Sequence, residues 1–467
     1  MSEVQQNWVK WPMVALALVL SSGTFVAISF TEQPSIIALT AAITMLVGTM
    51  WVTEAMPIPV TSMIPFVAFP LAGVIDHKTA ASALGNHVIV LLMGAFMLSK
   101  ALEKSGVHVR LAFNMLRLTG THSARRIVLA FMLTAAVLSM WISNSATTLM
   151  LVPLGLAVVA HLNQPRLAIV LLLGIAYAAS LGGVGTPIGT PPNIIFMSVY
   201  EEFTGIQMTF LDWMQYGVPI VVLAIPIMAL WLTRGIGELA HTPIPEQPAW
   251  SSPERRVLIV FAFIAMAWVF RPYWSAFLGA PGIGDSTVAL LGVVAMCLIP
   301  SGETNPETKK PEYLLDWQTA QYIPWGMLLL FAGGICIASA FTHSGLSQLI
   351  GEALSGLTVL PIVLLVLGIC LAVSFLTEIT SNTATATLLM PILASAAMAN
   401  NIDPALLMIP AAISASCAFM LPVATAPNAI VYATGKIDIS TMAKEGALLN
   451  VIVAVIAAGV ISLQFSA

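Results

Sequence analysis

The chain has 467 residues, of which 58% are hydrophobic and only 8% are charged, and its mean hydropathy is +0.95. Soluble domains average about 25% charged residues, so this composition excludes an ordinary soluble protein. The net charge of −4 gives no basic surface for nucleic acid, and the four cysteines lie in apolar runs without CxxC spacing, which predicts small core residues rather than disulfides or metal ligands.

Apolar windows of about 20 residues, the length that crosses a bilayer, recur along the whole chain. The first is longer than the apolar stretch of a cleaved signal peptide, and no small-residue cleavage site follows it, so we expect it to be the first membrane helix. Uninterrupted spans are predicted at 11–30, 36–54, 60–74, 87–104, 216–233, 254–270, 284–300, 322–342 and 442–465.

Two segments, 125–160 and 357–398, are too long for a single crossing, and each is interrupted by a polar motif. The first contains SNSATTLMLVP at 143–153, and the second contains SNTATATLLMP at 381–391. The position of each motif in the middle of an apolar segment predicts a re-entrant helical hairpin with the SN pair at its tip.

Two further segments, 166–200 and 404–434, are interrupted by GGVGTPIGTPPN (182–193) and LPVATAPN (421–428). Glycine and proline do not continue a helix there. Non-helical backbone at membrane depth is tolerated only inside protein or beside a wet cavity, so both segments are predicted to span the membrane as helices unwound at its middle.

The paired motifs reveal an internal repeat. Ser143 and Ser381 are 238 positions apart, and Asn193 and Asn428 are 235 apart. An odd number of predicted spans separates the halves, so they face opposite ways across the membrane. Inverted repeats with paired broken helices are typical of secondary transporters whose site lies at the bilayer midplane.

The distribution of basic residues predicts the orientation. With the N-terminus in the cytoplasm, only Lys78 and Arg271 of the 17 lysines and arginines lie outside, and Lys100 lies within a span. The remaining 14 lie at inner ends, a strong positive-inside bias: Lys10, Lys104, Arg110, Arg117, Arg125, Arg126, Arg166, Arg234, Arg255, Arg256, Lys309, Lys310, Lys436 and Lys444. Eleven spans then place the C-terminus outside, with the first hairpin opening inward and the second outward.

The four motifs suit the joint binding of a cation and an anion. A sodium ion needs oxygen ligands such as hydroxyls, amide oxygens and freed backbone carbonyls, whereas a carboxylate needs N–H and O–H donors. The side chains of Asn144 and Asn382 each provide one acceptor oxygen and two donors. No Arg or Lys lies in these motifs, so co-bound cations and helix N-termini are expected to compensate an anionic substrate.

Structural roles compete with these functional ones. A single SN before a helix is ordinarily an N-cap, but two copies at an inverted-repeat offset favour a binding role. Glu54 precedes loop proline and is expected to be structural at a helix end. Glu378 is predicted to brace the second hairpin rather than touch substrate.

The motifs WVTEAMPIPVT, SMWISNSATT, GTPIGTPPN, FLTEITSNTAT and LPVATAPNAIV resemble, in order along nearly the whole chain, the divalent anion/sodium symporter family of di- and tricarboxylate carriers. The resemblance implies a homodimer in which a mobile transport part moves as an elevator against a scaffold. It implies a scaffold at 1–120, a transport part at 121–235, a cytoplasmic linker and scaffold at 236–350, and a transport part at 351–467.

The resemblance also implies ligand sets. One sodium site would use Ser139, Ser143, Asn144 and backbone near Gly189, and the other would use Thr377, Thr380, Asn382 and backbone near Ala424. Substrate carboxylates would meet Asn144, Ser145, Thr190, Asn382, Thr383 and Thr425. The chain departs from the family pattern at Ser145, where threonine is usual, and at Ala426, where proline is frequent, and substrate choice could shift at both positions.

We therefore expect an all-α polytopic protein with about eleven membrane helices and two re-entrant hairpins, located in a bacterial inner membrane among lipids. Its expected function is sodium-coupled uptake of C4-dicarboxylates such as succinate, malate or fumarate, with Na⁺ co-transported. The alternatives are a citrate or sulfate carrier, a dicarboxylate exchanger of the same family, or a channel. An intramembrane enzyme is disfavoured because HExxH, GxSxG and facing carboxylate pairs are absent from the sequence.

Overall fold

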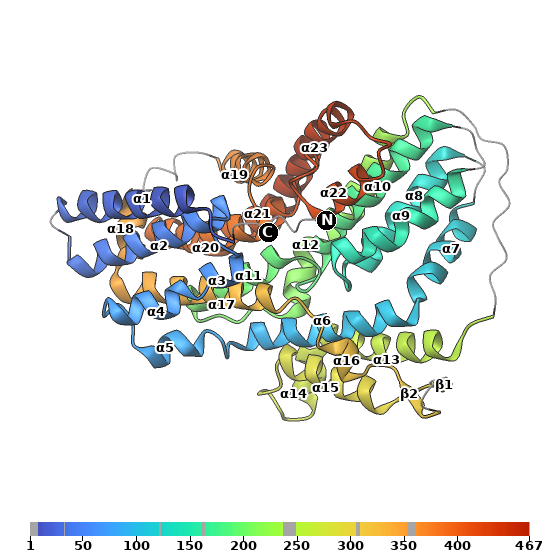
Figure 1. Cartoon of the computed structure of the whole chain (residues 1–467), viewed down its shortest axis with the longest axis horizontal. Helices are drawn as coiled ribbons and strands as arrows, with labels where there is room; N and C mark the ends of the chain where they lie inside the picture. The colour runs from blue at the N-terminus through green and yellow to red at the C-terminus, as the bar shows by residue number, and fades with distance from the viewer. Residues whose placement is uncertain are drawn as a thin grey trace, which may run out of the picture.

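The computed structural model describes residues 8–31, 33–120, 123–160, 164–236, 249–304, 309–353 and 361–466 (Figure 1). The predicted start of the second hairpin, 357–360, lies outside these residues. The described chain is built almost entirely of helices, as its composition predicts.

The first half of the chain begins with seven helices that precede its hairpin. They are α1 (Trp11–Ser29), α2 (Ser35–Thr53), α3 (Ile58–Thr61), α4 (Ile64–Leu71), α5 (His77–Ser82), α6 (His87–Ser105) and α7 (Val107–Thr119). The hairpin and the broken helix of this half follow, as α8 (Ala124–Ser139), α9 (Asn144–Ala160), α10 (Pro165–Gly182), η1 (Gly183–Gly185), α11 (Pro191–Thr204) and α12 (Phe210–Leu232).

The second half repeats this order after a different start. It opens with α13 (Ser252–Val269), α14 (Arg271–Phe277), α15 (Asp285–Leu298), β1 (Pro300–Thr304), β2 (Pro311–Tyr313), α16 (Trp317–Ala320), α17 (Trp325–Ser344) and α18 (Leu346–Ala353). It ends with α19 (Ile362–Thr377), α20 (Asn382–Ala399), α21 (Pro404–Ala415), α22 (Ala426–Tyr432) and α23 (Ile439–Ser466).

The helix boundaries confirm the repeat and the two predicted kinds of interruption. Helices α9 and α20 begin at Asn144 and Asn382, at the offset read from the sequence. Backbone between α8 and α9, and between α19 and α20, forms the two hairpin tips. Helical structure stops again between η1 and α11, within the first predicted motif, and between α21 and α22, where the break begins after Ala415, ahead of the predicted motif at 421–428.

The two halves interlock through their broken helices. Hairpin α8–α9 packs against α10, and α9 also packs against α22 from the other half. In the same way hairpin α19–α20 packs against α21, and α20 also packs against α11. Figure 1 shows α8, α9, α10 and α22 side by side in one part of the molecule. Each hairpin tip is therefore placed beside both breaks.

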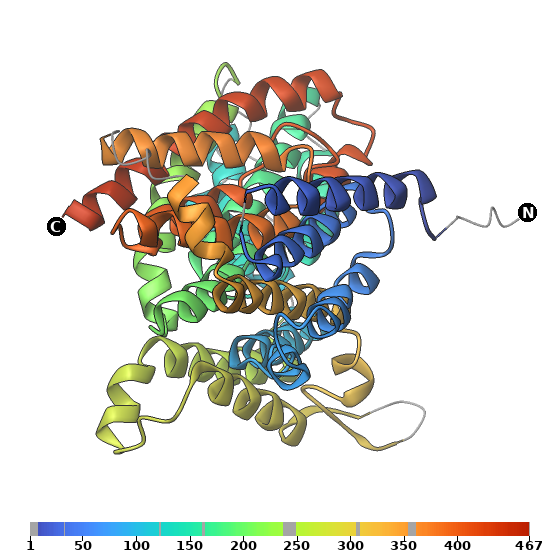
Figure 2. The ribbon, with the colours of Figure 1, turned by 90° about the vertical axis from the view of Figure 1, so that its left-hand side faces the viewer.

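The broken helices form the centre of the protein. Every described residue from 170 to 190 and from 404 to 419 is buried, as expected of helices that are apolar on all faces. Figure 2 shows α13–α15 along one edge of the molecule, and α19 and α23 along the opposite edge. A break at this depth is thus enclosed by protein rather than lipid.

Within the described residues, eight helices are long and apolar enough to cross a membrane, or up to nine if the bent pair α13–α14 counts as one span. The expected eleven crossings include broken and shorter helices, such as α15 and the pair α3–α4, which a length criterion leaves out. In the part of the chain that the structure describes, the departure from the all-α expectation is small. It is the antiparallel pair β1–β2, in which Pro300 pairs with Tyr313.

Candidate functional site

Each hairpin tip is closed by a hydroxyl group that contacts the asparagine of its own SN motif. Ser139 is the last residue of α8, and its Oγ lies 2.6 Å from Oδ1 of Asn144. Thr377 is the last residue of α19, and its Oγ1 lies 2.7 Å from Oδ1 of Asn382. The two tips therefore present the same arrangement in opposite halves of the chain.

The same hydroxyls also approach the broken helices. Ser139 Oγ lies 2.6 Å from the carbonyl oxygen of Ala179, and Thr377 Oγ1 lies 3.1 Å from that of Ala415. A hydroxyl has one hydrogen, and here it faces two acceptors. Each hydroxyl hydrogen is therefore shared between an amide oxygen and a backbone carbonyl oxygen, and the three oxygens of each cluster are of the kinds that coordinate sodium.

The breaks are held open by a second pair of asparagines. Asn193 Nδ2 donates to the carbonyls of Gly183 and Thr186, at 3.0 and 2.7 Å. In the second half, Asn428 Nδ2 donates to the carbonyls of Ala418 and Leu421, both at 3.0 Å. Oδ1 of each asparagine is buried without a hydrogen-bond partner. The sequence showed the spacing of these asparagines but did not predict their contacts.

A serine that the sequence did not single out links the two breaks. Thr190 Oγ1 lies 3.1 Å from Ser416 Oγ, where α11 begins and α21 ends. Thr425 Oγ1 instead accepts the backbone N–H of Asn428, as an ordinary N-cap does. Ser143 also caps its helix, since its Oγ accepts the N–H of Ala146.

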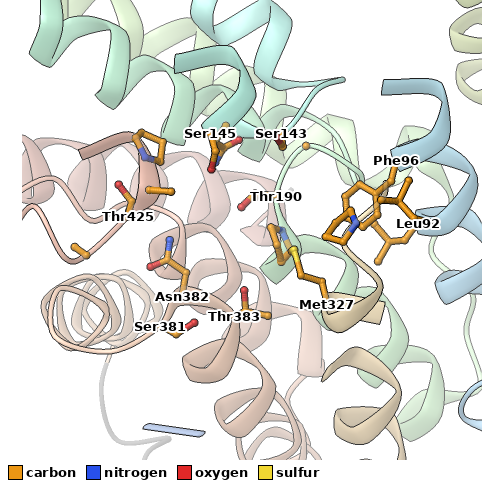
Figure 3. Close-up of a pocket in the computed structure, with 18 of the residues that line it drawn as sticks. Leu92, Phe96, Ser143, Ser145, Thr190, Met327, Ser381, Asn382, Thr383 and Thr425 are labelled. Atoms are coloured by element: carbon orange, nitrogen blue, oxygen red, sulfur yellow. The ribbon is translucent and has the colours of Figure 1, made fainter. Parts of the chain in front are cut away.

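The tips and breaks surround one cavity of about 810 Å³. Figure 3 shows Ser143 and Ser145 from one tip, Ser381, Asn382 and Thr383 from the other, and Thr190 and Thr425 from the breaks around it. Ten of the twelve predicted site residues line this cavity: Ser143, Asn144, Ser145, Gly189, Thr190, Thr380, Asn382, Thr383, Ala424 and Thr425. Ser139 and Thr377 are fully buried behind Asn144 and Asn382.

Thr380 differs from the other predicted sodium ligands. Its hydroxyl donates to the carbonyl of Leu376 at 2.9 Å and lies 2.6 Å from Thr385 Oγ1. It is therefore engaged one turn away from the Asn382 cluster, although it borders the cavity. Its role as a ligand stays a prediction, as does that of every other residue in the set.

Glu378 braces the second half, as predicted. Its Oε1 accepts the backbone N–H groups of Phe419 and Met420, at 2.7 and 2.9 Å, and Oε2 accepts that of Leu421 at 3.0 Å. Asn450 on α23 donates to the same carboxylate at 2.8 Å. Four donors satisfy this buried side chain, so it joins hairpin tip, break and last helix.

Among the residues that the structure describes, three charged side chains line the cavity. Glu54, Lys100 and Glu103 line it, from the end of α2 and the second half of α6. Glu54 is also the C-cap of α2, in a left-handed conformation with φ of 48°, which confirms its predicted place at a helix end. Neither Lys100 nor Glu103 was among the residues predicted for the site.

Known proteins resemble this chain in sequence and in fold. Residues 48–407 match the model of a family described as citrate transporter. The chain belongs to this transporter family. The resemblance read from the motifs is thereby confirmed, and the protein is a transporter rather than an enzyme.

Two relatives that match most of this chain share one name with each other. The sodium-dependent dicarboxylate transporter SdcS of Staphylococcus saprophyticus is 37% identical over 437 residues, covering 88% of this chain and 83% of the relative. The protein of that name from Staphylococcus aureus strain USA300 is 36% identical over 441 residues, covering 89% and 83%.

A solved structure supports the fold. The crystal structure of the Alcanivorax borkumensis YdaH transporter aligns with a TM-score of 0.54, covering 83% of this chain and 87% of that one. The identity is 14%, so the likeness concerns the architecture alone.

Proposed function

We propose that this protein is a secondary active transporter that couples the uptake of C4-dicarboxylates, such as succinate, malate or fumarate, to sodium ions. The observation that carries the proposal is the pair of oxygen clusters around Asn144 and Asn382. In each, an amide oxygen, a hydroxyl oxygen and a backbone carbonyl oxygen converge, and these are the ligand types that a sodium ion needs. The names of the relatives agree with this chemistry.

The substrate would bind between the two cation clusters. Asn144, Ser145, Asn382 and Thr383 offer amide and hydroxyl donors to its carboxylates, and Thr190 and Thr425 complete the cavity wall. Because the four motifs contain no basic residue, bound sodium supplies the compensating charge. Loss of sodium therefore weakens substrate binding, which is the physical basis of coupling.

We propose that the hairpins and broken helices form one moving unit. Residues 121–235 and 351–467 would be the transport part, and 1–120 with 236–350 the scaffold. The interlocking of the two halves through α9–α22 and α20–α11 supports a single body. Two such protomers would form a homodimer in the inner membrane, surrounded by lipid.

The orientation follows from the positive-inside rule, with the N-terminus in the cytoplasm and the C-terminus in the periplasm. The cavity is lined by the ends of α2 and α6 and the start of α17, which lie on the cytoplasmic side in this orientation. The described conformation would then be the one that releases substrate inward.

Uptake of labelled succinate into proteoliposomes tests the proposal. We expect uptake to require an inward sodium gradient and to increase with a negative interior, because more sodium charges than substrate charges enter. Competition by malate, fumarate, citrate and sulfate ranks the anions. Equal succinate movement without sodium would contradict coupling and favour an exchanger, and failure to accumulate against a gradient would favour a channel.

A further inference from the structure

The cavity extends beyond the predicted site toward an inner rim formed by the ends of α2 and α6. On α6 its lining includes Phe96 and, one helical turn further, Lys100. Figure 3 shows Leu92 and Phe96 on the opposite side of the cavity from Thr425. Lys100 thus borders the path between the motifs and the cytoplasm, although none of the paired motifs contains it.

Of the described residues that line the cavity, Lys100 is the one with a positive charge. Its Nζ forms an ion pair with Oε2 of Glu103 at 2.7 Å, and the two side chains are 29% and 18% exposed. Glu54 adds a second carboxylate to the same cavity. A dianion on its way out meets two negative groups and one positive group.

This ion pair suits a reversible role better than a purely structural one. A lysine is a flexible point charge with three rotatable donors, and a pair three residues apart on one helix is weak and easily exchanged. An ammonium group on a cavity wall attracts an anion over several ångströms, and a narrow, water-filled path concentrates that effect. The substrate carboxylate and Glu103 therefore compete for the same ammonium.

We propose that Lys100 forms a transient carboxylate-binding station at the inner mouth of the cavity, exchanging Glu103 for a carboxylate of the substrate as the dianion leaves or enters from the cytoplasm. The proposal rests on the proposed dicarboxylate transport and on the inward orientation of this rim. It assigns to this rim a second, weaker anion site that is separate from the four motifs and independent of sodium.

The next turn of α6 provides a matched control. Lys104 also pairs with a carboxylate, since its Nζ lies 2.6 Å from Oδ2 of Asp316, but Lys104 does not line the cavity. Its side chain is 32% exposed, close to the value for Lys100. Removing either charge alters the net charge of the protein equally, so only Lys100→Met is expected to change substrate kinetics.

The experiment compares sodium-dependent succinate transport in right-side-out and inverted membrane vesicles made from the same cells. Lys100→Met should raise the half-saturating succinate concentration at the cytoplasmic face about fivefold, the size expected of one partly exposed charge pair. The value at the periplasmic face should stay within about twofold of wild type. Raising ionic strength with choline chloride at constant sodium should shrink the difference, because salt screens the attraction.

Three further variants complete the test. Lys100→Arg should keep the wild-type value, Glu103→Gln should lower the half-saturating concentration by about twofold to threefold because it frees the ammonium, and Lys104→Met should change neither face. The sodium concentration for half-maximal transport should stay unchanged in all of them. The amount of monodisperse protein in detergent checks folding.

The possible failures are distinguishable. If wild-type vesicles show no sodium-dependent succinate transport, the proposed function is wrong. If wild type transports but Lys100→Met behaves like Lys104→Met, or weakens both faces equally, the station is wrong while the transport function stands.

Discussion

The breaks in the two broken helices line the same cavity, but different local contacts stabilise them. In the first half α10 continues into η1, and glycines make the break compact. A Cβ on Gly183 would lie 2.8 Å from both Asn144 Oδ1 and the carbonyl oxygen of Gly189. In the second half α21 ends earlier, and Ala418 and Ala424 stand at the positions equivalent to Gly183 and Gly189.

Among the described residues, a carboxylate at the second break accepts backbone N–H groups that no helix carbonyl accepts, and the first break has no such carboxylate. Glu378 accepts three consecutive backbone N–H groups at the second break, whereas the equivalent position in the first half is Met140. The first break is instead held by Trp213 Nε1, which donates to the carbonyl of Val184 at 2.8 Å. Both halves have an asparagine cluster, which agrees with the proposed ion binding, whereas the contacts that support the two breaks differ.

The largest effect is expected when either cluster loses its asparagine. Asn144→Ala and Asn382→Ala each remove an amide that we propose contacts cation and substrate, so each should lower sodium-driven succinate uptake by at least about 100-fold, as when an essential polar contact is removed. Uptake in proteoliposomes measures this. Asn401→Gly, in an exposed left-handed turn, is the control and should transport normally. Wild-type uptake in either alanine variant would remove that tip from the site.

A smaller loss, in stability, is expected when Glu378 is changed, because in the described part of the chain only the second break is supported by a carboxylate. Glu378→Gln replaces one acceptor oxygen by an amide that faces backbone N–H groups, which should cost about 2–3 kcal/mol of stability. Trp213→Phe removes one neutral hydrogen bond in the first half and should cost about 1 kcal/mol. Hydrogen exchange locates the damage: residues 416–425 should loosen in the first variant and 183–190 in the second. Equal loosening of both breaks in one variant would contradict independent support.

Two glycines test how closely the last helix of each half must approach its break. A Cβ on Gly217 of α12 would lie 2.2 Å from the carbonyl oxygen of Val184, and one on Gly446 of α23 would lie 2.2 Å from that of Phe419. Each alanine variant should lose about 1–3 kcal/mol through overpacking, measured as a lower midpoint of thermal unfolding in detergent. Gly459→Ala on α23 meets nothing within 4 Å and should not be destabilised.

The smallest effects are expected at the residues that follow the asparagines. Thr383→Ala should raise the half-saturating succinate concentration about fivefold, as expected for one lost hydrogen bond, with little change in the sodium requirement. Ser145→Thr adds only a methyl group beside the cavity and should change anion preference by less than about threefold. Titrations of succinate at fixed sodium, and of sodium at fixed succinate, separate a change in succinate affinity from a change in the sodium requirement. A larger change in sodium dependence for Thr383→Ala would place this hydroxyl at the cation instead.

Much of the candidate site could be predicted because it is repeated. The SN motifs located the two hairpin tips, which precede α9 and α20, and the GGVGTPIGTPPN and LPVATAPN motifs located the breaks, although α21 ends at Ala415, before the second motif begins. The brace role of Glu378 also followed from the sequence, since an ionisable group at that depth requires partners. The contacts of Asn193 and Asn428 were missed, although their spacing was visible.

The amino-acid sequence by itself determined the order of the apolar spans, the polar interruptions and their inverted pairing. These features are local, because span length follows bilayer thickness and because proline and glycine interrupt a helix where they occur. What only the tertiary structure decided is which surfaces meet. Three features depend on the packing of helices that are distant in the chain. They are the contact of Ser139 with Ala179, the contact between Thr190 and Ser416, and the position of Lys100 on the cavity wall. No local pattern encodes such contacts, since they arise from packing.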